Sequence, residues 1–206
     1  GPEGRMDSAE LAENLLNTIE TQVVPLTEKG VKNGNKLFGA AIVSNDFSKC
    51  VPGTNNEFRN PLFHGEVSAI FNYFDLEESE RPGGPKECIF FATHEPCPLC
   101  LSAIAWTGFP VVYYLFTYQD TKDAFCIPHD LKILDSVFKC PDGGYNRNNE
   151  FFTARSVQEL INEVGDETKK SSLNTRIEAL RVKYDELSAT YQEMKAQGKT
   201  GNVVLG

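Results

Sequence analysis

Two short motifs constrain the fold of this chain more than any other feature. The first is His64-Gly65-Glu66, and the second, about thirty residues later, is Pro96-Cys97-Pro98-Leu99-Cys100. Each motif opens a predicted helix, at residues 64–74 and 98–107, and a predicted strand at 88–93 lies between them. The chain must therefore fold so that the starts of two helices come together.

The residue types in these motifs are those of a catalytic metal site. One imidazole, His64, and two thiolates, Cys97 and Cys100, suit Zn²⁺ and leave its fourth tetrahedral position open. Cys97 and Cys100 are three residues apart, so one helical turn places both sulfurs on the same side. The helix start also lowers the pKa of thiols there. Glu66, two residues after the histidine, is the candidate proton carrier.

A closed structural zinc site is the alternative interpretation, because it needs only a fourth protein ligand. The residues that could supply it are Cys50, Cys88, Cys126, Cys140, His94 and His129. Each of them is more commonly a buried thiol or a surface imidazole than a ligand.

Helices and strands alternate along the chain, which predicts an α/β fold with layers of helices on a sheet. Apolar residues recur every four positions in an amphipathic helix over 8–23, and a loop with Gly30 and Gly34 follows. Further strands are predicted at 37–43, just before Pro52, and at 111–116. Further helices are predicted at 130–138 and 156–164.

The last part of the chain carries a heptad stripe on a charged helix. Its apolar residues alternate in steps of four and three: Leu173, Ile177, Leu180, Tyr184, Leu187, Tyr191 and Met194. Either the helix packs on its own domain or it pairs with a second subunit. We expect three parts: residues 1–5 as a tag remnant, 6–165 as the domain that carries both motifs, and 166–206 as the C-terminal helix and tail.

Composition excludes several classes of protein. Six cysteines in 206 residues are too few for a disulfide scaffold, so reduced thiols or metal ligands are expected. No stretch has the roughly 20 apolar residues of a membrane span, and no secretory signal is present, so we expect a cytoplasmic protein. The formal net charge of −9 weighs against nucleic-acid polymers as partners.

Together, the two motifs resemble the signature of the cytidine and deoxycytidylate deaminase superfamily. The resemblance covers about residues 11–138 and is nearest to the branch of guanine, cytosine and transfer-RNA adenosine deaminases. It implies a three-layer αβα sandwich with a mixed sheet and a C-terminal helical extension. It also implies one Zn²⁺ per subunit, held by His64, Cys97 and Cys100, with Glu66 moving the protons, in a homodimer.

The same resemblance suggests residues that contact the substrate. Asn55 would hydrogen-bond the base or ribose, and Phe38, Gly39 and Ala40 would border the base. A second carboxylate is expected near the predicted lid, where the candidates are Asp123, His129 and Asp130. Phe63 and Trp106 are aromatic residues that could stack on a base.

These features predict hydrolytic removal of an exocyclic amine from a free base or nucleoside, with release of ammonia. Glu95, before the second motif, resembles purine-acting members, whereas Gly65 resembles cytosine deaminases, and guanine or guanosine is favoured over cytosine or cytidine. One alternative is a base editor of transfer RNA or single-stranded DNA, which would need a basic groove. Another is a catalytically silent zinc scaffold whose heptad helix binds a partner.

Overall fold

The computed structural model describes residues 5–125 and 128–201. Most of the expected tag remnant, residues 1–4, lies outside the described residues, as does Cys126. Among the described residues, no helix is both long enough and apolar enough to pass through a membrane.

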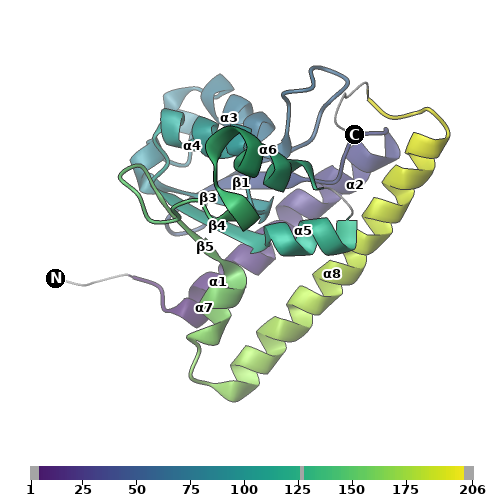
Figure 1. The fold of residues 1–206 in the computed structure, drawn as a ribbon. Helices are drawn as coiled ribbons and strands as arrows, with labels where there is room; N and C mark the ends of the chain where they lie inside the picture. Colours follow the sequence, from purple (N-terminus) through teal and green to yellow (C-terminus); the bar gives the residue numbers. More distant parts are fainter. Residues whose placement is uncertain (1–4, 126–127, 202–206) are drawn as a thin grey trace.

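A mixed sheet of five strands forms the middle of the molecule (Figure 1). Its strands are β1 (Gly39–Ser44), β2 (Cys50–Thr54), β3 (Cys88–His94), β4 (Val111–Phe116) and β5 (Thr153–Ser156), in the order β2-β1-β3-β4-β5. β1 is antiparallel to both β2 and β3, whereas β3, β4 and β5 run parallel. Pro52 lies inside β2, where it is tolerated because β2 is an edge strand.

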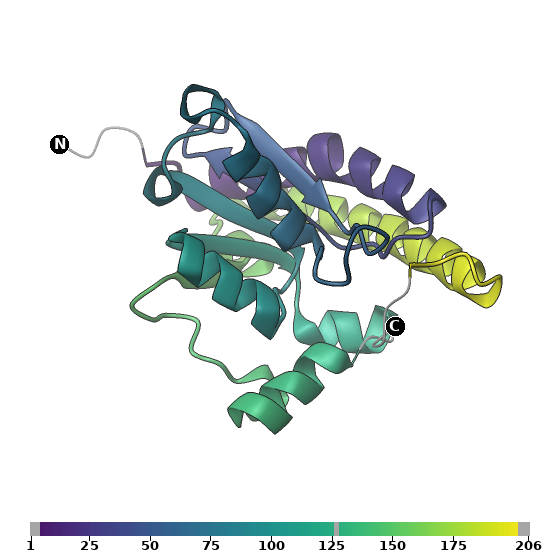
Figure 2. The same cartoon turned by 90° about the horizontal axis from the view of Figure 1, so that it is seen from above.

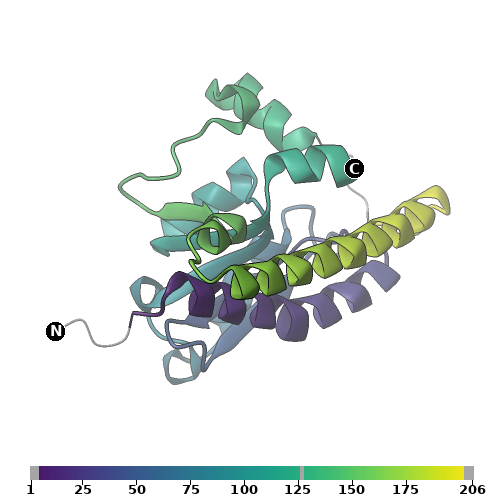
Figure 3. The ribbon, with the colours of Figure 1, turned by 90° about the horizontal axis from the view of Figure 1, so that it is seen from below.

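Helices cover both faces of the sheet (Figures 2 and 3). One face carries α1 (Ser8–Thr18), α2 (Val24–Lys32), α7 (Val157–Asn162) and α8 (Glu167–Ala196), and the other carries α3 (Gly65–Asp75) and α4 (Pro98–Thr107). Alternate side chains of each strand face opposite layers, so Phe91 joins the first core and Phe90 the second. The predicted three-layer αβα sandwich with a mixed sheet is confirmed.

The first helix is longer than its sequence pattern predicts. It continues without a loop through a π-helical turn, Ile19–Val23, into α2, and ends at Lys32. Apolar residues spaced four apart drift around an ordinary α-helix by about 40° at each step. A π-helical turn absorbs one extra residue and keeps Ile19 and Val23 facing the core, where both are buried. The expected loop at Gly30 is therefore helical.

The heptad stripe of α8 packs on its own sheet. Six of its residues are buried in the same core as α1 and α2: Leu173, Ile177, Leu180, Tyr184, Leu187 and Tyr191. A ladder of ion pairs flanks them at 2.9, 2.8 and 2.7 Å, namely Lys169–Glu13, Arg176–Glu20 and Lys183–Glu28. The cations are seven residues apart, and the acidic partners are seven and then eight apart, so the π-helical turn keeps the two helices in register.

Several smaller elements were not predicted from the sequence. They are β5, α5 (Tyr118–Phe125) and the short 3-10 helices Glu78–Glu80, Pro85–Glu87 and Pro141–Gly143. The predicted helix at 130–138 is α6 (His129–Phe138), and the predicted strand at 37–43 begins only at Gly39. α4 and β4 have the predicted bounds.

Because α8 belongs to the core, we expect Leu180→Ala to destabilise the protein by about 3 kcal/mol. Leu180 is 5% exposed, whereas Val182 on the same helix is 58% exposed. Val182→Ala should change the free energy of unfolding by less than about 0.5 kcal/mol. Urea denaturation of both variants measures this difference, and equal effects would contradict the packing of α8.

Candidate active site and metal centre

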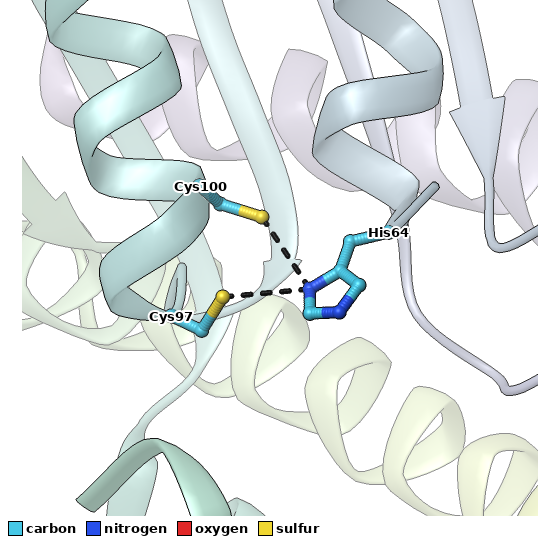
Figure 4. A group of neighbouring side chains, drawn as sticks. All are labelled: His64, Cys97 and Cys100. Carbon is cyan, nitrogen blue, oxygen red and sulfur yellow. Dashed lines mark hydrogen bonds between the residues drawn. The ribbon is translucent and has the colours of Figure 1, made fainter. Parts of the chain in front are cut away.

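Three potential metal ligands meet between α3 and α4 (Figure 4). Nδ1 of His64 lies 3.4 Å from Sγ of Cys97 and 3.6 Å from Sγ of Cys100. All three ligand atoms lie within 4.8 Å of one another. Among the described residues, this is the one cluster of three or more such side chains. It brings together the three ligands predicted from the sequence.

The local fold explains why these side chains converge. His64 is the N-cap of α3 and Cys97 is the N-cap of α4, so both helix starts point at the same place. α3 is held close to β1 by Gly65, because a Cβ there would lie 2.6 Å from the Cα of Gly39. Any larger residue at position 65 would push His64 away from the two thiols.

The pKa values of the two cysteine thiols are shifted in opposite directions. The hydrogen bond from Cys100 holds the pKa of Cys97 well below its usual range, and His64 lowers it further. Burial raises the pKa of Cys100, and the negative charge of Cys97 adds to the effect. Burial lowers the pKa of His64, but the hydrogen bond to Cys97 and the negative charges of Cys97 and Glu66 together outweigh it and raise the value to about 9. The protons held between these atoms are the ones that a soft divalent cation displaces, so the donor set fits zinc.

Glu66 lies beside this cluster and is 5% exposed. Its Oε2 is 3.4 Å from Sγ of Cys100. Burial raises the pKa of Glu66 to about 7, and the nearby Cys97 thiolate adds to the shift. A carboxyl group whose pKa is near neutral pH can both accept and donate a proton, which general acid–base chemistry requires.

A cavity of about 290 Å³ opens onto this cluster. Its lining consists of Lys36, Phe38, Asn55, Pro61, Leu62, His64, Glu66, His94, Glu95, Cys97, Pro98, Leu99, His129, Asp130 and Ile133. The size is near the lower end of ordinary small-molecule pockets, roughly 300–1,000 Å³. The cavity therefore suits a compact ligand.

Two polar side chains on this lining were among the sequence candidates. Asn55 is 2% exposed, and its Oδ1 is buried with no hydrogen-bond partner among the described residues. Asp130, at the start of α6, has its pKa raised to about 7 by burial and by the charges of Cys97 and Glu66. Of the three candidates for a second carboxylate or its equivalent, His129 and Asp130 line the cavity and Asp123 does not.

Other predicted substrate contacts lie outside this lining. Ala40 is in the core, and Gly39 packs against α3 and Val23. Phe63 contacts Phe71 and the guanidinium of Arg59. Trp106 is 92% exposed, and Asp123 is exposed and accepts a hydrogen bond from Gln119. None of these five residues is among those that line the cavity.

Glu95, two residues before Cys97, binds a segment that is distant in the chain. Its Oε1 accepts a 2.8 Å hydrogen bond from Nε of Arg147 and one from the hydroxyl of Tyr145, and its Oε2 accepts one from the backbone N–H of Tyr118. Glu95 is 3% exposed, so these bonds satisfy a buried carboxylate. Sequence analysis did not find this link, because Arg147 is 52 residues away.

His94 also lines the cavity, but as a neutral, buried ring. Thr93 Oγ1 lies 2.7 Å from its Nδ1, and the rings of Phe38 and Tyr184 pack against it. Burial lowers the pKa of His94 to about 3. It therefore remains uncharged in the folded protein at neutral pH and well below it.

This shift predicts a specific acid sensitivity. Between pH 6.5 and 3 the unfolded chain binds a proton at His94 that the folded chain does not, so stability is full above pH 6.5 and falls as pH decreases. From pH 7.5 to 5 wild type should lose about 2 kcal/mol relative to His94→Gln. Urea titrations at the two pH values measure this, with His129→Gln as the half-buried control. Parallel pH dependences of wild type and His94→Gln would contradict it.

Comparison with known proteins identifies the family. Residues 16–116 match the model described as the cytidine and deoxycytidylate deaminase zinc-binding region. The chain is 33% identical over 110 residues to guanine deaminase of Bacillus subtilis (strain 168), covering 52% of this chain and 68% of that one. The chain belongs to this deaminase family. The fold is accordingly cytidine deaminase-like, and the cofactor of the His64, Cys97 and Cys100 cluster is zinc.

Solved structures of similar proteins are also deaminases. Guanine deaminase from Bacillus subtilis is 25% identical with a TM-score of 0.43, and covers 68% of this chain and 98% of its own. Guanine deaminase from Nitrosomonas europaea is 15% identical with a TM-score of 0.47, and covers 85% of this chain and 88% of its own. The predicted superfamily is thus confirmed by the family model and the sequence relative.

Proposed function

We propose that this protein hydrolyses the exocyclic amine of a free nucleobase or nucleoside, with guanine or guanosine preferred over cytosine or cytidine. The observation that carries the proposal is a cavity whose lining includes Glu66, two of the three zinc ligands, Asn55 and Asp130. Membership in the deaminase family and the guanine deaminase relative support it.

In the proposed reaction, Glu66 moves the protons and the zinc ligands hold the metal. When bound, zinc supplies an acidified water as the nucleophile. Glu66 accepts a proton from this water at its carboxylate and passes it to a ring nitrogen of the base. The oxygen that loses this proton bonds to the carbon that carries the amine. Glu66 then moves the second proton of the same oxygen to the amine, so that a C=O bond forms, the C–N bond breaks and ammonia leaves. Burial of Glu66 keeps its carboxyl poised for both transfers.

The lining of the cavity supports a purine over a pyrimidine. Oδ1 of Asn55 and the carboxyl of Asp130 both offer hydrogen-bond acceptors. Guanine carries two ring N–H groups besides its amine, whereas cytosine carries one. The rings and aliphatic chains of Phe38, Leu62, Leu99 and Ile133 provide apolar contacts for a flat ring.

An ammonia-release screen of the zinc-loaded protein tests the proposal. The panel is guanine, guanosine, cytosine, cytidine, adenine and adenosine, with their deoxy forms, between pH 6 and 9. We expect guanine or guanosine to be the best substrate. Silence across the panel with zinc confirmed would overturn the proposal and favour a polynucleotide substrate or a silent scaffold. Salt-sensitive binding of transfer RNA or single-stranded DNA would then distinguish these two.

We propose also that the protein is a homodimer that associates through the outer face of α3 and α4. The exposed large apolar side chains on these two helices that do not line the cavity are Phe71, Phe74 and Trp106. α4 carries no charged residue. An apolar patch of this kind is better buried against the same patch of a second copy than against a charged partner. Light scattering should give twice 22.9 kDa for wild type and a single chain for Trp106→Glu. A single chain for wild type at all concentrations would refute the dimer.

A further inference from the structure

The amide of Asn55 is held by a buried carboxylate two residues away. Nδ2 of Asn55 donates a 2.6 Å hydrogen bond to Oε1 of Glu57. Asn55 is 2% exposed and Glu57 is 4% exposed, so water does not compete for this bond. Glu57 itself is not part of the cavity lining, whereas Asn55 is.

Glu57 is in turn fixed by the backbone. The N–H of Lys36 donates to both of its carboxylate oxygens, at 3.3 and 3.2 Å. The N–H of Glu57 donates to Oδ1 of Asn35 at 3.0 Å. These hydrogen bonds fix the position from which the carboxylate of Glu57 accepts the hydrogen bond of Asn55.

This arrangement determines which way the amide of Asn55 points. A carboxylate offers only acceptors, so it can face the NH₂ of the amide but not the carbonyl oxygen. Oδ1 of Asn55 is consequently turned away from Glu57, and it is the buried oxygen that has no partner among the described residues. A buried acceptor without a partner costs about 1–3 kcal/mol, which a donor on a ligand can recover.

The end of the described chain closes over Glu57. After α8, residues 197–201 turn back toward the end of α2, as the yellow segment in Figure 1 shows. The N–H of Gly201 donates to the carbonyl oxygen of Gly34 at 3.3 Å. A Cβ at position 201 would lie 2.8 Å from Cβ of Glu57, so the glycine permits this close contact. Gly34, at φ +88°, admits Lys199 in the same way.

We infer that Glu57 is a positioning residue that presents the carbonyl oxygen of Asn55 to the substrate, and that the turn at 198–201 holds Glu57 in place. This inference rests on the proposed function. It adds that the substrate group against Asn55 is an N–H or O–H donor. The segment that follows the C-terminal helix thereby contributes to substrate recognition without touching the cavity.

Glu57→Gln tests the inference with little change in shape. A glutamine amide offers both a donor and an acceptor, so it no longer dictates the orientation of Asn55. We expect KM for the best substrate to rise about tenfold, as for the loss of one hydrogen bond, with kcat changed less than threefold and zinc content unchanged. Glu77→Gln, which removes the same charge from an exposed loop, should leave KM unchanged.

A double-mutant cycle separates positioning from general loosening of the fold. If Glu57 acts through Asn55, adding Glu57→Gln to Asn55→Ala should raise KM no further. An equal rise in KM on the wild-type and Asn55→Ala backgrounds would overturn the inference.

A measurement without substrate keeps the inference separate from the proposed function. In the zinc-loaded protein, NMR should show one Nδ2 proton of Asn55 shifted downfield and protected from exchange, and Glu57→Gln should abolish both effects. Gly201→Val, which crowds Glu57, should weaken them. If wild type deaminates no base but this signal behaves as described, the proposed function fails while the positioning stands. An Asn55 amide unaffected by Glu57→Gln refutes the positioning.

Discussion

Glu66→Gln is expected to lower kcat by about 10³-fold while zinc remains bound, because the proton carrier is removed and the metal ligands are kept. The substitution preserves the size of a side chain that is 5% exposed, so the fold should be unaffected. KM should change little, since the loss falls on the transition state and not on binding of the substrate.

The measurement pairs steady-state kinetics with metal analysis of the same samples. Glu77→Gln, on an exposed loop, is the control with the same change of charge. Near wild-type turnover in Glu66→Gln, with one zinc per chain, would show that another group moves the protons. Asp130 would be the first to test, because it is the other carboxyl of raised pKa on the cavity.

Cys100→Ala should abolish both zinc retention and activity. Its thiol is fully buried between His64 and Cys97, so the two remaining donors cannot enclose the ion. A bound metal stabilises the folded state, by about 4 kcal/mol when free metal is a thousand times Kd. The variant should therefore melt at the temperature of the chelator-treated wild type, and added zinc should not raise it.

Cys50→Ser is the matched control, because Cys50 is a thiol on β2 outside the cluster. It should keep one zinc per chain and full activity. Tight retention of zinc by Cys100→Ala would instead indicate a further protein ligand, as in a structural site. Calorimetry and metal analysis distinguish the two results.

The parts of the site that the sequence predicted are those set by neighbours in the chain. His64 and Glu66 are two residues apart, and Cys97 and Cys100 span one turn of a helix, so local geometry is enough to bring each pair together. α4 has the predicted bounds, and the structure gives the reason: Pro98 occupies the first turn, and Gly108 ends the helix in the left-handed conformation.

The parts that the sequence did not reveal depend on contacts between distant residues. β5 has only four residues, and it is defined by its pairing with β4 and not by a sequence pattern of its own. The ring of Trp106 was expected near a base, but the orientation of α4 on the sheet decides which of its faces is exposed. Likewise, the spacing of Asp123 and Asp130 cannot tell which carboxyl reaches the cavity, because that depends on how α5 and α6 pack.

The helical layer of α1, α2 and α8 combines an early and a late part of the sequence. This order affects how the chain folds during its synthesis. The strands from β1 to β4 and both metal motifs have all been synthesised by Phe116, yet the helical cover that α1 and α2 begin on one face of their sheet is completed only when Tyr191 has left the ribosome. At about 5–20 residues per second, His94 and Phe116 wait several seconds for Tyr184, which packs on both rings. The nascent chain therefore passes through a stage at which chaperones have an apolar surface to bind, and completion of α8 ends it.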